Sequence, residues 1–242
     1  MTALLEVNGI SKSFRGLQAV SNASFTLQEG SIGALIGPNG AGKTTIFNMI
    51  AGVLRPDAGT IVFQSRPIQG LRPDQVCLAG IGRTFQLVKP FAGLTVLENV
   101  MVGAFLRERS PTRARTLALQ TLARLELDGK AALPASALTL PDRKRLEVAR
   151  ALATRPKLLL LDEVMAGLRP TETDQMVQAL RELHRASGTT ILLIEHVMRA
   201  VMALADHVGV LHQGQVIARG TPGEIVRHPA VLACYLGEET EV

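Results

Sequence analysis

Apolar residues along the chain fall into short runs that predict β-strands. Residues 158–161 and 191–194 are continuous apolar stretches within the segments 158–162 and 190–194, and such runs are typical of strands that are buried on both faces of a sheet. The last two runs are joined by Gln213 and Gly214, a turn pair that predicts a hairpin. The predicted strands are residues 5–7, 20–27, 32–36, 61–63, 158–162, 190–194, 207–212 and 215–219.

Other segments repeat their apolar residues at helical spacing. These are residues 43–54, 94–127, 143–154, 171–187 and 197–205. The second is interrupted near Ser110 and Pro111, and a short terminal helix is expected after Thr221, with Pro222 just inside it. Strands that alternate with helices indicate an α/β protein with a mostly parallel sheet, and the early cluster of short strands predicts an added antiparallel subdomain.

Composition narrows the class of protein. The chain has 242 residues, no 18-residue stretch free of charge and no secretory leader pattern at its start, so we expect neither a membrane-spanning helix nor secretion. Cys77 and Cys234 are its two cysteines, which excludes a disulfide scaffold and fits a reducing compartment. The net charge of +5 is mild and selects no class of partner.

A glycine-rich segment after residues 32–36 has the form G-x-x-x-x-G-K-[ST] and opens a predicted helix. Its glycines allow backbone N–H groups to converge on phosphate oxygens, and the helix N-terminus adds positive charge. Lys43 supplies a full charge for the β- and γ-phosphates, and the Thr44 hydroxyl suits Mg²⁺. The alternative is a tight turn that binds nothing. The predicted nucleotide-binding residues here are Gly37, Pro38, Asn39, Gly40, Ala41, Gly42, Lys43, Thr44 and Thr45.

Two acids follow the apolar residues 158–161. An acid at the end of a buried strand can hold the water shell of Mg²⁺, and we assign that role to Asp162. Glu163 is placed to orient and deprotonate the water that attacks the γ-phosphate. The alternative for Glu163 is a solvated acid at a helix start.

These motifs and several further segments resemble the ATP-binding subunit of an ABC transporter over essentially the whole chain. Residues 83–86 (Arg-Thr-Phe-Gln) and 94–100 are similar to the group that imports branched-chain and other hydrophobic amino acids. Residues 193–196 resemble that group's switch-histidine loop, and residues 233–238 resemble its ending.

The resemblance implies roles for single residues. Gln86 would touch Mg²⁺ and water and report the nucleotide state to membrane subunits, unless it is an ordinary exposed glutamine. His196 would contact the γ-phosphate and position the water and Glu163, unless it is structural. Phe14 would stack on adenine, although a core or surface phenylalanine is a serious alternative.

The resemblance also implies an architecture and an assembly. We expect one ATP-binding domain over residues 1–242, with a P-loop (RecA-like) core, an antiparallel β-subdomain and a helical subdomain near residues 88–150. ATP and Mg²⁺ are the implied ligands. The implied partners are a second, unlike ATPase in a heterodimer, two permease subunits and a separate solute-binding protein. The implied place is the cytoplasmic face of the inner membrane, as a peripheral protein.

The signature segment departs from the family's Leu-Ser-Gly-Gly-Gln, which contacts the γ-phosphate held by the opposite subunit. Here Thr139 can replace the serine, Pro141 removes one backbone donor, and Asp142 would repel phosphate unless it turns away or pairs with Arg143 or Arg145. One lost donor to a charged oxygen costs about 1.5–3 kcal/mol. We therefore expect an asymmetric heterodimer whose weaker site uses residues 138–142.

The segment after Glu163 departs as well. Val164 stands where the family commonly has proline, and Arg169 stands where a loop ends in Asp or Asn. An arginine cannot act as an acceptor. Arg169 is either a partner for an acid across the dimer or a solvated surface residue.

Two clusters of basic residues raise rival functions. Aromatics form only 3% of the chain, and the basic residues alternate with helical apolar positions, so we expect solvated helix faces, with lipid headgroups second and no nucleic-acid binding. The rival functions are the ATPase of a lipid or lipopolysaccharide extractor and a soluble non-transport ABC protein. The clusters are Arg107, Arg109, Arg113 and Arg115, and Arg143, Lys144, Arg145 and Arg150.

Overall fold

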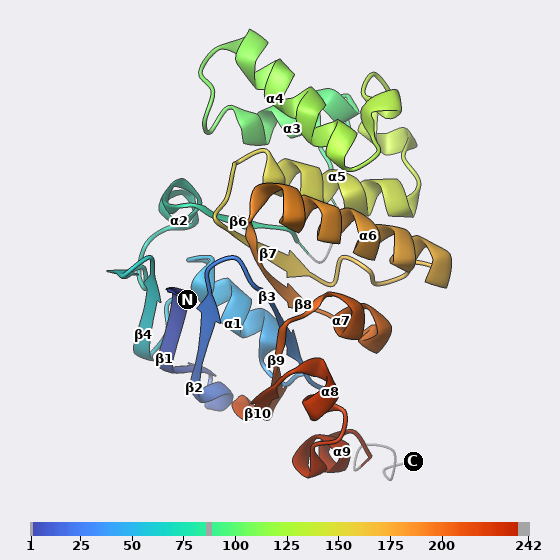
Figure 1. Cartoon of the computed structure of the whole chain (residues 1–242). Coiled ribbons are helices and arrows are strands. Elements are labelled where there is room, and N and C mark those ends of the chain that lie inside the picture. Colours follow the sequence, from blue (N-terminus) through green and yellow to red (C-terminus); the bar gives the residue numbers. More distant parts are fainter. Residues whose placement is uncertain (1, 86–88, 237–242) are drawn as a thin grey trace. The chain divides into compact units, whose positions relative to one another are not determined.

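A computed structural model describes residues 2–85 and 89–236 of the chain (Figure 1). The backbone forms two compact units. The first contains residues 1–76 and 190–242, and the second contains residues 77–189. Each unit is described by itself below.

An antiparallel sheet forms the beginning of the first unit. Its strand order is β2-β1-β4-β5, from β1 (Ala3–Phe14), β2 (Leu17–Gln28), β4 (Ala58–Phe63) and β5 (Arg66–Pro67). Strands β1 and β2 are longer than predicted, and β1 continues through Gly9. Gly9 lies at a register shift with a φ of 60°, so the strand bends there and continues. The predicted antiparallel subdomain is confirmed.

Parallel pairing begins with β3 (Ile32–Ile36), which lies between β8 (Thr190–Ile194) and β9 (His207–His212). All residues of β3 and β8 are buried, as their unbroken apolar runs predict. Strand β10 (Gln215–Gly220) pairs antiparallel with β9 through the predicted turn. The helices of this unit are α1 (Lys43–Ile50), α7 (Met198–Leu204), α8 (Pro222–Ile225) and α9 (Pro229–Leu236), and α2 (Pro73–Ala79) joins it to the second unit.

The second unit contains two strands and a group of helices. Strands β6 (Ile81–Arg83) and β7 (Leu158–Asp162) run parallel. The helices are α3 (Val96–Ala104), α4 (Pro111–Arg124), α5 (Leu140–Leu152) and α6 (Pro170–Ser187), with single turns η1 (Asp128–Lys130) and η2 (Ala135–Ala137). Helices α3, α4 and α5 pack on one another, and Leu122, Leu146 and Val100 are fully buried among them.

Helix boundaries differ from the predictions where local chemistry decides them. Helix α5 begins at Leu140 rather than 143, because Thr139 has N-cap geometry and Pro141 suits the first turn. Helix α1 ends at Ile50, four residues before the predicted end, and Gly52 follows with a φ of 74°. Among residues 2–85 and 89–236 no helix has the length and apolarity needed to cross a membrane. The helical subdomain of residues 88–150 stays a prediction.

Candidate functional site

The glycine-rich loop of the first unit leaves β3 at Ile36 and enters α1 at Lys43. Gly37, Gly40 and Gly42 all have positive φ, at 146°, 77° and 101°. A Cβ atom on Gly37 would lie 1.9 Å from the carbonyl oxygen of Leu211, so no side chain fits there. The sequence therefore folds into a tight backbone cradle ahead of a helix N-terminus, which is the form that binds phosphate.

Lys43 is drawn into this loop. Its side chain is 5% exposed, and its Nζ donates hydrogen bonds to the carbonyl oxygens of Gly37 at 2.6 Å and Pro38 at 2.7 Å. Thr44 is exposed and Thr45 is half-buried. The ammonium group is therefore held at the loop by oxygens with partial negative charge, which phosphate oxygens can replace.

His196 belongs to the same edge of the parallel strands as the loop. Leu35 of β3 pairs with Ile194 of β8 in parallel register, so Gly37 and His196 both follow the carboxyl ends of neighbouring strands. The His196 side chain is exposed. Parallel sheets bind ligands at this edge, so the structure brings the predicted switch histidine and the phosphate loop to one side of the sheet.

Phe14 is the last residue of β1, and 42% of it is exposed. A core phenylalanine is thereby excluded at this position. Lys12 Nζ lies 5.8 Å from the centre of its ring, while also pairing with Asp57 Oδ1 at 2.6 Å. The exposed ring is free to stack on a planar ligand, as predicted for adenine, and surface exposure alone remains the alternative.

Asp162 ends β7 in the second unit and is 1% exposed. Its Oδ2 accepts a hydrogen bond from Arg83 Nη2 at 3.0 Å, and its backbone N–H donates to Thr84 Oγ1 at 3.0 Å. Its Oδ1 has no hydrogen-bond partner in the described part of the chain. Burial raises the pKa of this carboxyl and the charge of Glu163 adds to the rise, while Arg83 opposes both. A buried carboxylate with a vacant oxygen fits the water shell of a hard cation.

Glu163 follows with a positive φ of 51° and is half-buried. This backbone conformation is costly for a residue with a side chain, and such strain gathers at functional sites. Lys144 Nζ donates to the Glu163 carbonyl oxygen at 2.8 Å and so braces the strained residue. Lys144 and Arg83 are therefore candidate functional residues. The sequence alone assigned neither of them a role at the site.

The second basic cluster is mostly not a solvated face, contrary to expectation. Lys144 is 5% exposed and Arg145 is 9% exposed. Arg145 pairs with Glu126 at 2.8 Å, and Arg150 pairs with Glu147 at 2.7 Å. These side chains project from α5. Their apolar stems pack against neighbouring residues, while their charged groups bond to oxygen atoms nearby.

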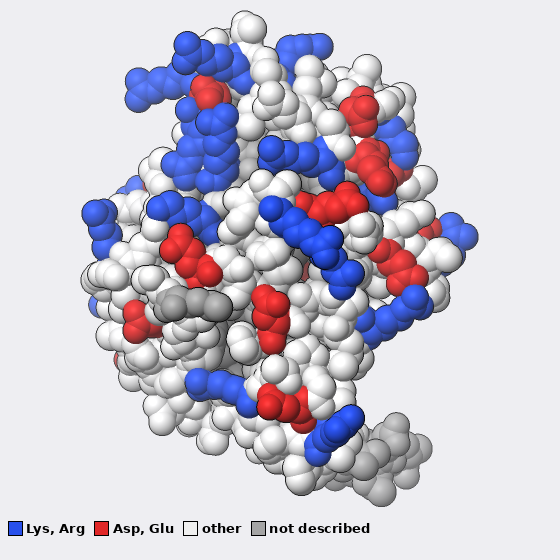
Figure 2. Space-filling view, viewed as in Figure 1, with Lys and Arg blue, Asp and Glu red and all other residues white. Residues whose placement is uncertain are grey.

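The first basic cluster largely matches its prediction. Arg109, Arg113 and Arg115 are exposed. Figure 2 shows cationic side chains gathered on the surface around α4. Arg107 differs, because its guanidinium group donates to the carbonyl oxygen of Thr154 at 2.8 Å.

The altered signature has a structure that the sequence did not predict. Thr139 occupies the N-cap position of α5 without a side-chain bond to the helix backbone, and its Oγ1 donates to Asp142 Oδ2 at 2.8 Å. Lys130 Nζ donates to the same oxygen. Burial acts to raise the pKa of Asp142, but the bonds from Lys130 and Thr139 outweigh it and the pKa is lowered. Of the two alternatives raised for Asp142, pairing with Arg143 or Arg145 is not the one found, since these arginines bond the Ser136 carbonyl and Glu126.

Arg169 finds its partner within the chain. It stands at the N-cap position of α6, and its side chain pairs with Glu172 at 2.8 Å. The Glu172 carboxylate also accepts from the Arg169 backbone N–H at 2.8 Å. The arginine side chain is 82% exposed, so it lies on the surface of this chain, and both predicted alternatives stay predictions. Gln86, predicted to contact Mg²⁺, lies outside the described residues.

Comparison with known sequences identifies the family. A sequence model described as "ABC transporter" matches residues 20–166, and one described as "Branched-chain amino acid ATP-binding cassette transporter" matches residues 215–241. The chain is 44% identical to the high-affinity branched-chain amino acid transport ATP-binding protein LivG of Salmonella typhimurium, over 97% of this chain and 98% of that protein. BraF of Pseudomonas aeruginosa, described in the same terms, is 39% identical over 97% of this chain and 98% of its own length.

Comparison with solved structures agrees. The ADP conformation of an ATP-binding cassette from an ABC transporter is 31% identical and has a TM-score of 0.89, covering 98% of this chain and all of that one. A nucleotide-free cassette gives 30% identity and a TM-score of 0.88, over 97% of this chain and 99% of that chain. The cradle at the phosphate loop, the strand-end acid and these full-length matches lead to one conclusion. The chain belongs to the ABC transporter family, as an ATP-hydrolysing cassette of the branched-chain amino-acid (LivG and BraF) type.

Proposed function

We propose that this chain is the motor subunit of an importer for branched-chain or similar hydrophobic amino acids. The observation that carries the proposal is identity of 44% across nearly the whole length of a LivG protein. The match at residues 215–241 to the branched-chain group supports it, because this tail lies outside the nucleotide-binding motifs. We further propose a peripheral place on the cytoplasmic face of the membrane.

A lipopolysaccharide extractor is the second candidate. The LptB protein of Acidithiobacillus ferridurans, a lipopolysaccharide export ATP-binding protein, is 34% identical over the full length of both chains. That identity is lower than the 44% identity to LivG, and the family model that matches residues 215–241 favours the amino-acid group. A soluble non-transport ABC protein has no comparable support.

ATP would be held first by the phosphate loop, residues 37–45. Backbone N–H groups of the loop and the N-terminus of α1 would face the β- and γ-phosphates, and Lys43 would exchange its loop carbonyls for phosphate oxygens. Phe14 would stack on adenine, because its ring is exposed at the end of β1.

Mg²⁺, when bound, would neutralise charge on the β- and γ-phosphates. The Thr44 hydroxyl, Gln86 and the vacant Oδ1 of Asp162 are the groups we propose for it. Arg83 would keep Asp162 ionised and oriented through Oδ2, leaving Oδ1 for the ion's water shell.

Hydrolysis would proceed by in-line attack of water on the γ-phosphate. Glu163 would orient and deprotonate this water, and His196 would position it and contact the γ-phosphate. The strained backbone at Glu163, braced by Lys144, would fix the direction in which the carboxylate points. Most of the rate enhancement would come from positioning and charge neutralisation.

The signature supports a heterodimer with a second, unlike ATPase. Thr139 and Asp142 would face the γ-phosphate bound by that partner, but Pro141 lacks a backbone donor and the Thr139 hydroxyl is engaged by Asp142. The site completed by this signature would be the weaker of the two. Two permease subunits and a separate solute-binding protein would complete the complex, with no nucleic acid.

Purification of this chain from detergent-solubilised native membranes, followed by mass spectrometry, tests the assembly. A second ATPase and two polytopic proteins are expected, together with amino-acid stimulation of ATP turnover in the presence of the binding protein. Recovery of only copies of this chain with a lipid-handling membrane pair would replace the importer by the extractor. Ribosomal or DNA-repair proteins in their place would end the transport proposal.

A further inference from the structure

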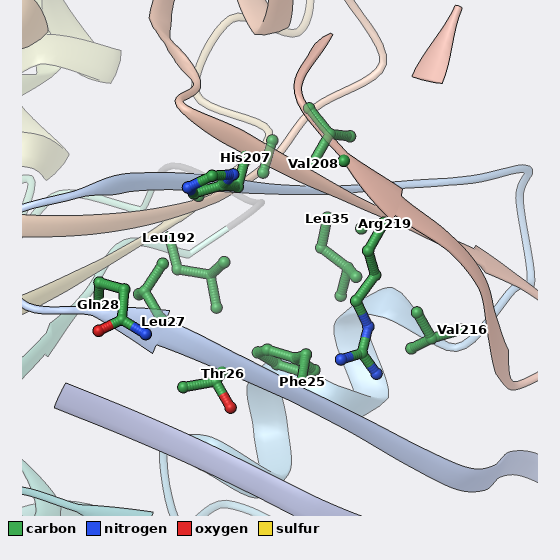
Figure 3. Close-up of a pocket in the computed structure, with 14 residues that line it drawn as sticks. Phe25, Thr26, Leu27, Gln28, Leu35, Leu192, His207, Val208, Val216 and Arg219 are labelled. Atoms are coloured by element: carbon green, nitrogen blue, oxygen red, sulfur yellow. The ribbon is translucent and has the colours of Figure 1, made fainter. Parts of the chain in front are cut away.

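A pocket of about 340 Å³ lies in the first unit, and none of the residues that line it belongs to the phosphate loop. Its walls come from β2, β3, β8, β9 and β10, and β10 packs against β2 beside it. Figure 3 shows Leu27, Leu35 and Leu192 in the middle of the pocket and Arg219 extending from β10 toward Phe25 on β2. The volume falls at the lower end of the range for small-molecule sites, roughly 300–1,000 Å³.

The interior of the pocket is aliphatic. Leu27, Leu35, Leu192 and Val208 are all less than 5% exposed, and Val216 lies beside them on β10. The polar side chains of the lining are those of Thr26, Gln28, His207 and Arg219, and Figure 3 shows them spread around the pocket. A small ligand with a branched or straight hydrocarbon body matches such an interior, because burying its carbon atoms removes apolar surface from water.

The charge at the mouth of the pocket is positive. Arg219 is exposed, and its guanidinium group makes no ion pair or hydrogen bond in the described part of the chain. No Asp or Glu lines the pocket. Glu224 interacts electrostatically with His207, which lines the pocket. The Glu224 Oε2 atom already accepts hydrogen bonds from the Thr221 backbone N–H at 2.7 Å and from the Thr221 hydroxyl at 2.9 Å. An uncompensated arginine beside an aliphatic cavity favours an anionic head on an apolar body.

We propose that this pocket binds a small aliphatic carboxylate. Its hydrocarbon body lies against the leucines and valines, and its carboxylate accepts paired hydrogen bonds from Arg219. Three sources share this chemistry: a branched-chain amino acid, the corresponding 2-oxo acid, and a medium-chain fatty acid.

The walls of the pocket also hold the phosphate loop. In the β9–β10 hairpin, the Leu211 carbonyl packs on Gly37 and the Gly214 N–H donates to the Ala41 carbonyl at 3.0 Å. In β2, the Ser21 N–H donates to the Gly214 carbonyl at 2.8 Å. A ligand wedged between β2 and β10 therefore acts on the two elements that shape the loop. Its occupancy changes nucleotide affinity, and nucleotide changes carboxylate affinity by the same factor. This coupling rests on nucleotide binding at the loop.

The test is isothermal titration of the full-length chain with octanoate, leucine and 4-methyl-2-oxopentanoate, and with octan-1-ol as the uncharged probe. Arg219→Gln removes the anchor, and Arg66→Gln is its control, since Arg66 is also an exposed strand arginine but lies outside the pocket. Gly209→Val fills the cavity. A Cβ there would lie 3.5 Å from Leu35 Cδ1, an ordinary contact, so a side chain can begin at this position without a clash, and urea unfolding of the variant checks that it folds.

We expect at least one carboxylate to bind, Arg219→Gln to weaken it about tenfold, and Arg66→Gln to leave it unchanged. Gly209→Val should abolish binding of carboxylate and alcohol alike. The carboxylate that binds most tightly identifies the source. Absence of binding by all three carboxylates would overturn the proposal. So would equal binding of octanoate by wild type and Arg219→Gln.

The coupling is measured by titrating ATP with and without the bound carboxylate. A changed dissociation constant supports it, and an unchanged constant overturns it. Failure of ATP to bind when no carboxylate is present would instead count against the nucleotide site, so the two failures are distinguishable.

Discussion

Lys130 of η1 and the residues Thr139 and Asp142 at the start of α5 form a hydrogen-bonded set at the altered signature. Lys130→Met removes the ammonium group that bonds Asp142 Oδ2, while the Thr139 hydroxyl bond to that oxygen remains. The Asp142 side chain is 10% exposed, so it loses a charge partner in a poorly solvated place. We expect the variant to be less stable and its signature more repulsive to phosphate.

The free energy that the Lys130–Asp142 pair contributes to stability follows from how exposed the Lys130 side chain is. The Lys130 side chain is 42% exposed, so solvent screens the pair and its contribution is about 0.5–1 kcal/mol. For a chain of this size, a loss of 1 kcal/mol lowers Tm by roughly 2–4 °C.

The stabilisation that the Lys130–Asp142 pair contributes depends on pH. Because the pKa of Asp142 is lowered in the fold, the pair stabilises the protein at neutral pH, and this contribution is lost as pH falls through that lowered pKa, below the ordinary value of 3.8.

The assay is a double-mutant cycle measured by urea unfolding at pH 7. It compares wild type, Lys130→Met, Asp142→Asn and the double variant, and we expect a coupling free energy of about 0.5–1 kcal/mol. Lys157→Met is the matched control, because Lys157 is an exposed lysine of the same unit whose ammonium group makes no ion pair in the described residues. In the purified complex, Lys130→Met should also lower ATP turnover, and Lys130→Arg should restore it.

A coupling free energy near zero would refute the reasoning about stability. A loss of stability in Lys157→Met equal to that in Lys130→Met would refute it as well, since it would reflect lysine removal in general. Unchanged turnover in a complex that carries Lys130→Met would show that Asp142 does not need this counter-charge near phosphate.

Three further predictions concern the nucleotide site. Lys43→Ala should lower ATP affinity at least about tenfold, measured with a fluorescent ATP analogue, because it removes the loop's charge-assisted donor; normal affinity would remove Lys43 from the site. Gly37→Ala should weaken ATP binding and destabilise the fold by about 1–3 kcal/mol in urea unfolding, because its Cβ would collide with the Leu211 carbonyl. Wild-type stability in this variant would contradict the tight backbone geometry of the phosphate loop. Because the pKa of Asp162 is raised in the fold, its ionisation costs stability as pH rises from 3.8 through that raised pKa, so Asp162→Asn should gain stability relative to wild type as pH rises above 3.8. A difference in stability that stays constant with pH would contradict this sign.

Much of the fold was predictable because its signals are local. Residues 158–162 and 190–194 matched their strands without error, since unbroken apolar runs have few alternatives. The hairpin turn at Gln213 and Gly214 matched for the same reason. The full length of β1 was not predictable from its glycines, because Gly9 forms a bulge that depends on pairing with β2.

The candidate site likewise has a part that could be predicted from the sequence and a part that could not. The phosphate loop follows from its own sequence, because glycine conformation and helix entry are local properties. The partners of Asp142 and Asp162 are not local. Lys130 lies twelve residues from Asp142 along the chain and Arg83 lies 79 residues from Asp162, so packing of separate elements decides them. Burial of Lys144 was missed for a similar reason, since a basic residue at the start of a helix is normally solvated.

Uptake of labelled leucine into cells tests the central claim most directly, with this chain supplied as wild type or as Glu163→Gln in a strain from which it has been deleted. The account predicts uptake with wild type and almost none with Glu163→Gln, although the variant still binds ATP and assembles with its membrane partners. Uptake that is equal in both strains would exclude Glu163 as the base. Leucine uptake that is unaffected by deletion of the chain would contradict its role as the importer's motor.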